Sequence, residues 1–190
     1  NAIINQKLNK DLQIVMRVHP NYWADDKIRI ELFNKLEIFK NLKNIYIDYN
    51  KVKKIGKLPH LEKSDLDFTL NCYNHCDICL SVISSSMIEM IFCGKPSLNF
   101  MYGKWKLPGE TLDIVDYKLH HLEKLYEYDI IKHVFNIDDL FDKLNNLNEF
   151  KISSIDQKRM IDGEASVNLG KAAQVYSEEI YKLSKKNEQL

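Results

Sequence analysis

The stretch DICLSVISSSMIEMIFCGKPSLNFMY, residues 77–102, decides the fold of this 190-residue chain. A short apolar run at residues 78–83 predicts a strand that is buried on both faces. Three serines at positions 84–86 supply side-chain oxygens that favour the start of a helix. Gly94 and Pro96 favour the end of that helix, and residues 97–101 predict a second strand. The stretch therefore predicts a strand–helix–strand unit whose two strands run parallel.

The serine turn between this strand and this helix is the first candidate site. A helix start exposes unpaired backbone N–H groups and carries partial positive charge, to which Ser84, Ser85 and Ser86 add hydroxyl donors. At the carboxyl end of a parallel strand, such a turn suits a phosphate group. Glu89, one turn into the helix, would suit the two hydroxyls of a ribose. Ser86 and Glu89 also match a capping box, which needs no ligand. The pattern alone leaves both interpretations open and slightly favours the capping box.

The rest of the chain alternates between strand and helix patterns. This alternation predicts an α/β fold, a doubly wound and mostly parallel sheet flanked by helices. Strands are predicted over residues 12–18, 44–48 and 130–136. Helices are predicted over residues 2–10, 25–41, 64–75, 117–128, 137–147 and 162–186, the last one opening at Asp162. Loops are predicted over residues 49–63, which are rich in lysine, and over residues 99–116.

Length and composition limit the classes of protein that fit. A chain of 190 residues with 45% hydrophobic residues can bury one sizeable core, so we expect a single domain over residues 1–190. Lys+Arg and Asp+Glu are both 27, and this balance does not point to nucleic acid. We find no signal-peptide pattern and no run long enough to span a membrane. The chain starts at Asn1 inside a helix-like run, so we expect a fragment of a longer protein.

Four cysteines raise the question of a metal site. Cys72, His75, Cys76 and Cys79 are close in sequence, as zinc ligands often are. No second CxxC pair is present to complete such a site, and Cys79 is expected to point into the sheet. The sequence therefore favours buried free thiols in a reducing compartment over a zinc module.

Three motifs together resemble a known superfamily. They are the run from Asp77 to Pro96, the segment Arg17-Val18-His19-Pro20 at a strand end, and the segment from Asp162 to Ser166. In this order they resemble the donor-binding domain of GT-B glycosyltransferases, closest in style to bacterial enzymes of capsule, teichoic-acid and other surface-polysaccharide synthesis. The resemblance spans most of the chain. Its motifs are typical of the superfamily, which includes UDP-sugar 2-epimerases, and do not specify the substrate.

The resemblance implies a role for each candidate residue. Ser84, Ser85 and Ser86 would hold the diphosphate of a nucleotide-activated donor, and Glu89 would hold its ribose. His19 would contact a phosphate and help stabilise the departing nucleotide, which makes it the catalytic candidate. The remaining binding candidates are His60, which lies near the base in the similar enzymes, and three residues placed by their position in the sequence. These are Arg17, which could reach the same anion, and Asn99 and Tyr102, which follow the second strand and should face the transferred group. The donor is the substrate, a nucleotide sugar or a CDP- or CMP-activated compound, and no metal or other cofactor is implied. Without the resemblance, the sequence favours a surface histidine on a loop over a ligand contact for His19.

The resemblance also implies a reaction and a partner. Retaining GT-B enzymes place an acid seven residues before the ribose glutamate, where this chain has Val82 beside Ser81, which favours an inverting enzyme. An inverting enzyme needs a general base, and we expect a missing N-terminal acceptor domain to supply it. We therefore expect this chain alone to bind nucleotide weakly and to turn nothing over. The implied location is the cytoplasm, with peripheral association at the inner face of the membrane. The alternatives are a UDP-sugar 2-epimerase-like domain, a CDP-polyol phosphotransferase domain and a non-catalytic interaction domain.

Overall fold

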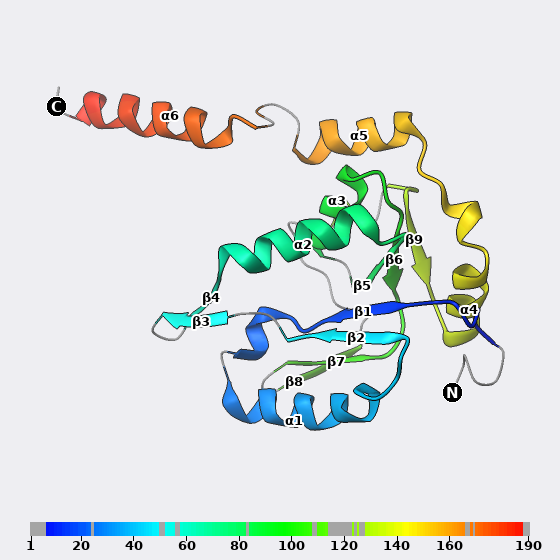
Figure 1. Ribbon diagram of the computed structural model, residues 1–190. Coiled ribbons are helices and arrows are strands. Elements are labelled where there is room, and N and C mark those ends of the chain that lie inside the picture. Colours follow the sequence, from blue (N-terminus) through cyan, green and yellow to red (C-terminus); the bar gives the residue numbers. More distant parts are fainter. Residues whose placement is uncertain are drawn as a thin grey trace.

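A computed structural model shows how the chain is arranged (Figure 1). It describes residues 7–23, 25–49, 52–55, 58–82, 84–107, 110–113, 123, 125, 128–165, 168 and 170–187. For residues 21, 52–55, 58–61, 105–107, 110–113, 186 and 187, only the backbone is described.

A three-stranded parallel sheet forms the centre of the second half of the chain. Its strands are β5 (Cys79–Ser81), β6 (Ser97–Phe100) and β9 (Ile131–Val134), in the order β5-β6-β9. Helix α3 (Ser85–Phe92) connects β5 to β6, which confirms the predicted strand–helix–strand unit. The prediction that the first strand is buried on both faces is wrong, because Leu80 is 36% exposed. Among the described strands, β5 lies at an edge of this sheet, where covering by neighbours is incomplete.

Helices cover both faces of the β5-β6-β9 sheet. On one face, Met87 and Ile91 of α3 pack with Ile131 of β9 and with Met160 of α5 (Ser154–Glu164). On the other face, Leu98 and Val134 pack against α4 (Ile137–Asn145). Burying these side chains stabilises the sheet by roughly 25 cal/mol for each Å² of apolar surface that is removed from water. The two cores fix the sheet between the helices.

The carboxyl end of α3 is held firmly. Gly94 has a φ of 75°, and its N–H donates to the carbonyl of Ile91, while the N–H of Lys95 donates to the carbonyl of Met90. These are the two hydrogen bonds of a Schellman motif, which favours glycine at this position. The side chain of Gln157, from α5, donates to the carbonyls of Ile91 and Phe92 at 3.0 and 3.1 Å. With this end fixed, the amino end of α3 is held at the carboxyl edge of the sheet.

The first half of the chain contains a second, smaller parallel sheet. Strand β1 (Ile14–Arg17) pairs with β2 (Ile45–Asp48). Helix α1 (Asp26–Leu36) lies between them in sequence, and the carboxylate of Asp25 accepts hydrogen bonds from the first turn of this helix. Two short 3-10 helices flank it, η1 (Pro20–Trp23) and η2 (Glu37–Phe39). In Figure 1, β1 and β2 lie crosswise to β6 and β9.

Helix α2 (Lys63–His75) links the two sheets. Its Phe68 ring lies 6.1 Å from the Tyr46 ring of β2, and its Tyr73 reaches α3. The helix starts after its N-cap residue Glu62, so Ser64, where the predicted helix begins, lies inside its first turn. The predicted helix at residues 64–75 is otherwise confirmed.

Both segments that the sequence predicted as loops contain antiparallel hairpins. Strands β3 (Val52–Ile55) and β4 (Leu58–Leu61) pair in the first, and β7 (Lys104–Leu107) and β8 (Glu110–Asp113) pair in the second. The loop prediction is wrong because it gave more weight to lysine, glycine and proline than to the apolar residues of these strands, such as Val52 and Ile55 in β3 and Leu58 and Leu61 in β4. Asn99 is also not in a loop, since it lies within β6.

The C-terminal prediction needs a larger correction. Asp162 does not open the last helix but lies in the last turn of α5, whose N-cap is Ser153. A separate helix, α6 (Ala172–Asn187), follows and extends away from the body (Figure 1). Gly163 lies in α5 against Tyr128, and a Cβ at this position would lie 2.1 Å from the Tyr128 hydroxyl oxygen. The glycine therefore permits a close approach and does not belong to a helix start.

The fold is thus α/β, with short parallel strands in two small sheets flanked by helices. A single continuous doubly wound sheet stays a prediction. Residues 7–10 are not helical, and the predicted helix at residues 117–128 lies almost entirely outside the described residues. The short helix η5 (Leu147–Phe150) follows α4. None of the helices in the described part of the chain combines the length and the apolar character that a membrane crossing requires.

Candidate functional site

The amino end of α3 lies at the carboxyl edge of the β5-β6-β9 sheet. Ser84 is the N-cap residue with an extended backbone, and its side chain makes no capping hydrogen bond to the helix. The carbonyl of Ser84 accepts from the N–H of Met87 at 3.1 Å. Ser85 is exposed, and Ser84 and Ser86 are half-buried. The first turn of α3 is therefore accessible, with its backbone N–H groups oriented as in an anion site.

The predicted capping box does not form. Ser86 lies inside α3 and not at its N-cap, and Glu89 points to a neighbouring helix. The carboxylate of Glu89 accepts a hydrogen bond of 2.6 Å from the hydroxyl of Tyr73 on α2. Burial of the Tyr73 ring, followed by its hydrogen bond to Glu89, raises the pKa of Tyr73 well above its ordinary value of 10, so the hydroxyl keeps its proton and remains a donor. The Ser86 hydroxyl opposes this rise in the pKa of Tyr73 but does not cancel it.

A row of polar side chains crosses the same edge of the sheet. Ser81 of β5, Asn99 of β6 and His133 of β9 are paired in register on neighbouring strands. The hydroxyl oxygen of Ser81 lies 3.2 Å from that of Ser84, which joins the row to the start of α3. Ser97, two residues before Asn99 on the same face, donates to the carbonyl of Met87 in α3. The row therefore faces α3.

The predicted residues are only partly brought together. Ser84, Ser85, Ser86 and Glu89 lie on α3, and Asn99 lies beside them through its pairing with Ser81. Tyr102 belongs to the opposite face, because it packs with the core of α4 and its ring lies 5.7 Å from that of Phe100. The sequence placed Asn99 and Tyr102 in one loop, but the sheet separates them.

The predicted residues of the first half lie on other elements, Arg17 and His19 at the end of β1 and His60 in the β3-β4 hairpin. His19 follows β1, where its carbonyl accepts from the N–H of Tyr22, and partial burial of its ring lowers its pKa below 6.5. The backbone of His60 lies in β4, in register with Lys53, and its side chain lies outside the described residues. Strand β4 runs beside η1, directly after His19. The elements that carry His19 and His60 are therefore neighbours in space.

Arg17 has a clear structural role. Its guanidinium donates to Asp48 of β2 and to Asp65 of α2, each at 2.9 Å, and to the hydroxyl of Thr69. Its Cζ also lies 5.2 Å from the Phe68 ring centre. Asp65 is only 4% exposed, so its charge depends on this pairing. The group ties β1, β2 and α2 together, and no sequence signal pointed to Asp65, because its partner is 48 residues away.

The cysteines are free thiols, each half-buried. Burial, followed by the proximity of Cys76 and Glu89, raises the pKa of Cys79 to about 11. Burial also raises the pKa of Cys72. Thiols in this state are weak nucleophiles and weak metal ligands. The described residues contain no cluster of three or more His, Cys, Asp or Glu side chains arranged to hold a metal ion.

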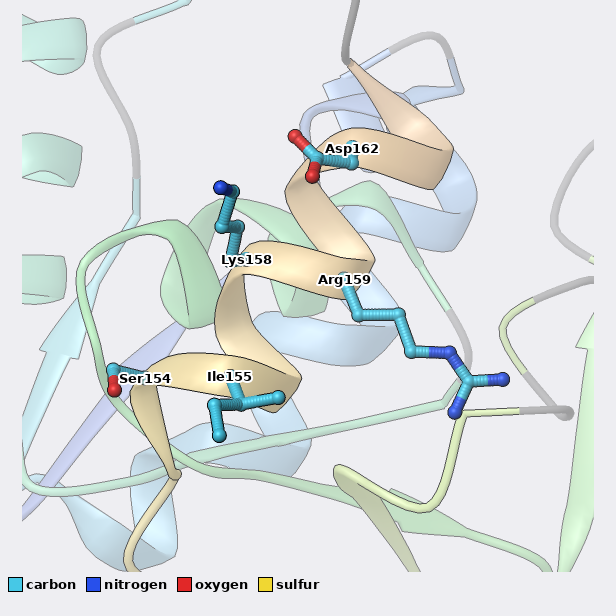
Figure 2. A pocket seen from close by; sticks show the side chains of 5 residues that line it. All are labelled: Ser154, Ile155, Lys158, Arg159 and Asp162. Atoms are coloured by element: carbon cyan, nitrogen blue, oxygen red, sulfur yellow. The ribbon is translucent and has the colours of Figure 1, made fainter.

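Two hollows lie away from the carboxyl edge. One, of about 550 Å³, runs along α5 and is lined by Ser154, Ile155, Lys158, Arg159 and Asp162 (Figure 2). All five side chains come from a single helix, and those of Lys158 and Arg159 diverge, so they do not converge on one ligand. The other, of about 190 Å³, adjoins residues 129–132 at the amino end of β9. Ligands of parallel sheets bind at the carboxyl ends of the strands, which favours the start of α3 over both hollows.

Comparison of the chain with protein-family models, with curated proteins and with solved structures gives no match.

Proposed function

We propose that this chain is the donor-nucleotide-binding domain of an inverting GT-B glycosyltransferase that acts in bacterial surface-polysaccharide synthesis. The proposal depends on one observation above all, the accessible first turn of α3 with an N-cap serine that does not cap it. This turn directly follows the parallel strand β5, at the edge where α/β sheets bind ligands. The sequence resemblance given above supplies the family and the reaction.

The diphosphate of the donor lies at this turn. Backbone N–H groups of the first turn and the hydroxyls of Ser84, Ser85 and Ser86 donate to its oxygens, and the helix dipole favours its negative charge. Because α3 is fixed at its other end by Gly94 and Gln157, these donors are held in place before the ligand arrives. Donors that need no reorganisation stabilise the charge that develops on the departing nucleotide most effectively.

The ribose lies beside Glu89. One carboxylate oxygen of Glu89 accepts from Tyr73, which orients the group. Glu89 is exposed and can accept hydrogen bonds from two ribose hydroxyls. Tyr73 acts through Glu89 and is a positioning residue in this proposal.

His19 contacts a phosphate of the same donor in the proposal. Its lowered pKa keeps the ring neutral at pH 7, so it contributes a hydrogen bond and not a full charge. The acceptor and the general base come from a partner domain in this scheme, and the reaction takes place in the cytoplasm, at the inner face of the membrane.

The test is a binding panel on the folded 190-residue chain. Isothermal titration with UDP, CDP, CMP and GDP is compared for the unchanged chain, for Glu89→Ala and for Tyr73→Phe. We expect Glu89→Ala to weaken the preferred nucleotide by about 1–3 kcal/mol, roughly 5- to 150-fold in Kd, because a charged acceptor is lost. Tyr73→Phe is expected to have a smaller effect in the same direction, because Glu89 is still present.

Glu31→Ala is the matched control, since Glu31 is an exposed glutamate of α1 that pairs with its helix neighbour Lys35. This variant should leave all affinities unchanged. Failure of every nucleotide to bind the folded chain at millimolar concentration contradicts the proposal and favours a non-catalytic interaction domain. Conversion of UDP-N-acetylglucosamine to its epimer would instead indicate a 2-epimerase.

A further inference from the structure

Asn99 is an uncommon residue for its position in the sheet. It lies in the central strand of the β5-β6-β9 sheet and is 0% exposed. Its amide nitrogen lies 3.1 Å from the sulfur of Met101 and 3.2 Å from Nδ1 of His133. Its carbonyl oxygen Oδ1 is buried and, within the described part of the chain, has no hydrogen-bond partner. Leaving such an oxygen unpaired is costly, and nearly all buried polar atoms in proteins have a partner.

The orientation of the Asn99 amide is determined by its neighbours. A thioether sulfur can only accept, so the amide NH₂ belongs on the side of Met101. The neutral ring of His133 accepts the second N–H through Nδ1. Burial, followed by the charge of Lys132, lowers the pKa of His133, which keeps this ring in the neutral form. Oδ1 is therefore the atom that remains as an acceptor.

The position of Asn99 connects this oxygen with the proposed donor site. Asn99 is in register with Ser81, and the hydroxyl of Ser81 lies 3.2 Å from that of Ser84, the N-cap of α3. A group bound next to a diphosphate at this N-cap therefore adjoins strand β6, and it reaches Oδ1 of the fully buried Asn99 only when the side chains that cover this atom move aside. A carbonyl oxygen carries partial negative charge and repels phosphate oxygens, whereas it accepts readily from a hydroxyl. The chemistry thus favours the uncharged, hydroxyl-rich part of the donor.

We propose that Asn99 Oδ1 accepts a hydrogen bond from a hydroxyl of the transferred sugar or polyol, and that His133 is a positioning residue that holds the amide for this contact. The inference rests on the proposed function, which it deepens by naming the group that recognises the transferred part of the donor. A site that loses a buried hydrogen bond discriminates strongly against the ligand that lacks the partner.

The experiment compares each nucleotide with its conjugate on the full chain. The pairs are UDP with UDP-glucose and with UDP-N-acetylglucosamine, CDP with CDP-glycerol, and GDP with GDP-mannose. The measured quantity is the ratio of the Kd of the bare nucleotide to the Kd of the conjugate. For the preferred pair, we expect a ratio of about 10 in the unchanged chain and of about 1 in Asn99→Leu, with the Kd of the bare nucleotide nearly unchanged. Asn99→Val, which suits a strand, gives the same test if the leucine variant does not fold.

Two further variants separate recognition from packing. Ser97→Ala is the matched control, because Ser97 is equally buried on the same face but donates to Met87 within the protein, and its ratio should stay near 10. His133→Phe removes the acceptor that orients Asn99, so the ratio of this variant should lie between those of the unchanged chain and of Asn99→Leu. An unchanged ratio in Asn99→Leu or Asn99→Val overturns the inference and indicates that a buried water satisfies Oδ1. A ratio near 1 in the unchanged chain overturns the inference but leaves the proposed function standing. If no nucleotide binds the folded chain, both the proposed function and this inference are contradicted.

Discussion

Polar side chains at the carboxyl end of β1 have partners within the protein, whereas some of those at the carboxyl edge of the β5-β6-β9 sheet do not. At the first, the guanidinium of Arg17 meets the carboxylates of Asp48 and Asp65, and all three groups obtain partners from the protein itself. At the second, the side chain of Ser84, the N-cap residue of α3, makes no capping hydrogen bond to the helix. The buried side-chain oxygen of Asn99 has no hydrogen-bond partner within the described residues. Both regions end parallel strands, and both looked like anion or ligand sites in the sequence.

The difference teaches that a polar residue at a strand end is no evidence for a ligand until its partners are known. A charge with two carboxylates of the protein is satisfied before any ligand arrives, and such a group stabilises the fold. A buried acceptor without a partner leaves a cost that a ligand can remove. The first region is therefore interpreted as structure and the second as a site.

The largest effect expected from this comparison concerns Arg17. We expect Arg17→Met to lower the free energy of unfolding by about 3 kcal/mol, because it leaves the buried Asp65 carboxylate without its cation. Urea unfolding followed by circular dichroism measures this. Nucleotide affinity should stay unchanged in the folded variant. A loss of affinity with little loss of stability would show instead that Arg17 contacts the donor and would remove the contrast between the two regions.

Gln157 tests whether α3 is held in place from its far end. Gln157→Leu removes two hydrogen bonds to the last carbonyls of α3, and we expect it to lower the free energy of unfolding by about 2 kcal/mol. Nucleotide affinity should also fall by a small factor, because the donors at the amino end become less well fixed. Gln174→Leu is the control, since Gln174 donates to Glu178 on the exposed surface of α6. Equal stability of the two variants would contradict the role given to Gln157.

The smallest effect is a dependence of stability on pH. Burial lowers the pKa of His19 and of His133 below 6.5 in the folded state, so the unfolded state binds more protons just below this pH. The contribution of each ring to stability is therefore full above about pH 6.5 and is lost as the pH falls through the window below it. We expect His19→Gln and His133→Gln each to reduce the slope of unfolding free energy between about pH 7 and 5. Unchanged slopes would show that the rings are solvated in the folded state.

Much of the fold could be predicted from the sequence. The helices α1 to α4 and the parallel strands were recognisable because each has its own periodicity and local end signals, such as Asp25 before α1 and Gly94 after α3. The two hairpins were missed because their strands are only four residues long and because lysine or proline lies inside β3, β4 and β7. The last helix was misplaced because Asp162 and Gly163 look like a helix start, whereas Gly163 makes room for Tyr128.

The candidate site was predicted in part. The serine turn and Glu89 lie where the pattern placed them, on the first turns of α3. The partner of Glu89 is Tyr73, and its identity depends on how α2 packs against α3. His133 and the burial of Asn99 could not be found either, because they follow from the order in which three strands pair.

The sequence by itself determined the strand–helix–strand unit, the serines at its turn and the α/β class, because these depend on periodicity and on neighbours within a few residues. Only the tertiary structure decided which polar groups find partners. It joined Arg17 to Asp65 across 48 positions of the chain and left Oδ1 of Asn99 unpaired in the middle of a sheet. Hydrogen bonds and ion pairs form between groups that are close in space, and for residues far apart in the chain that distance is set by packing.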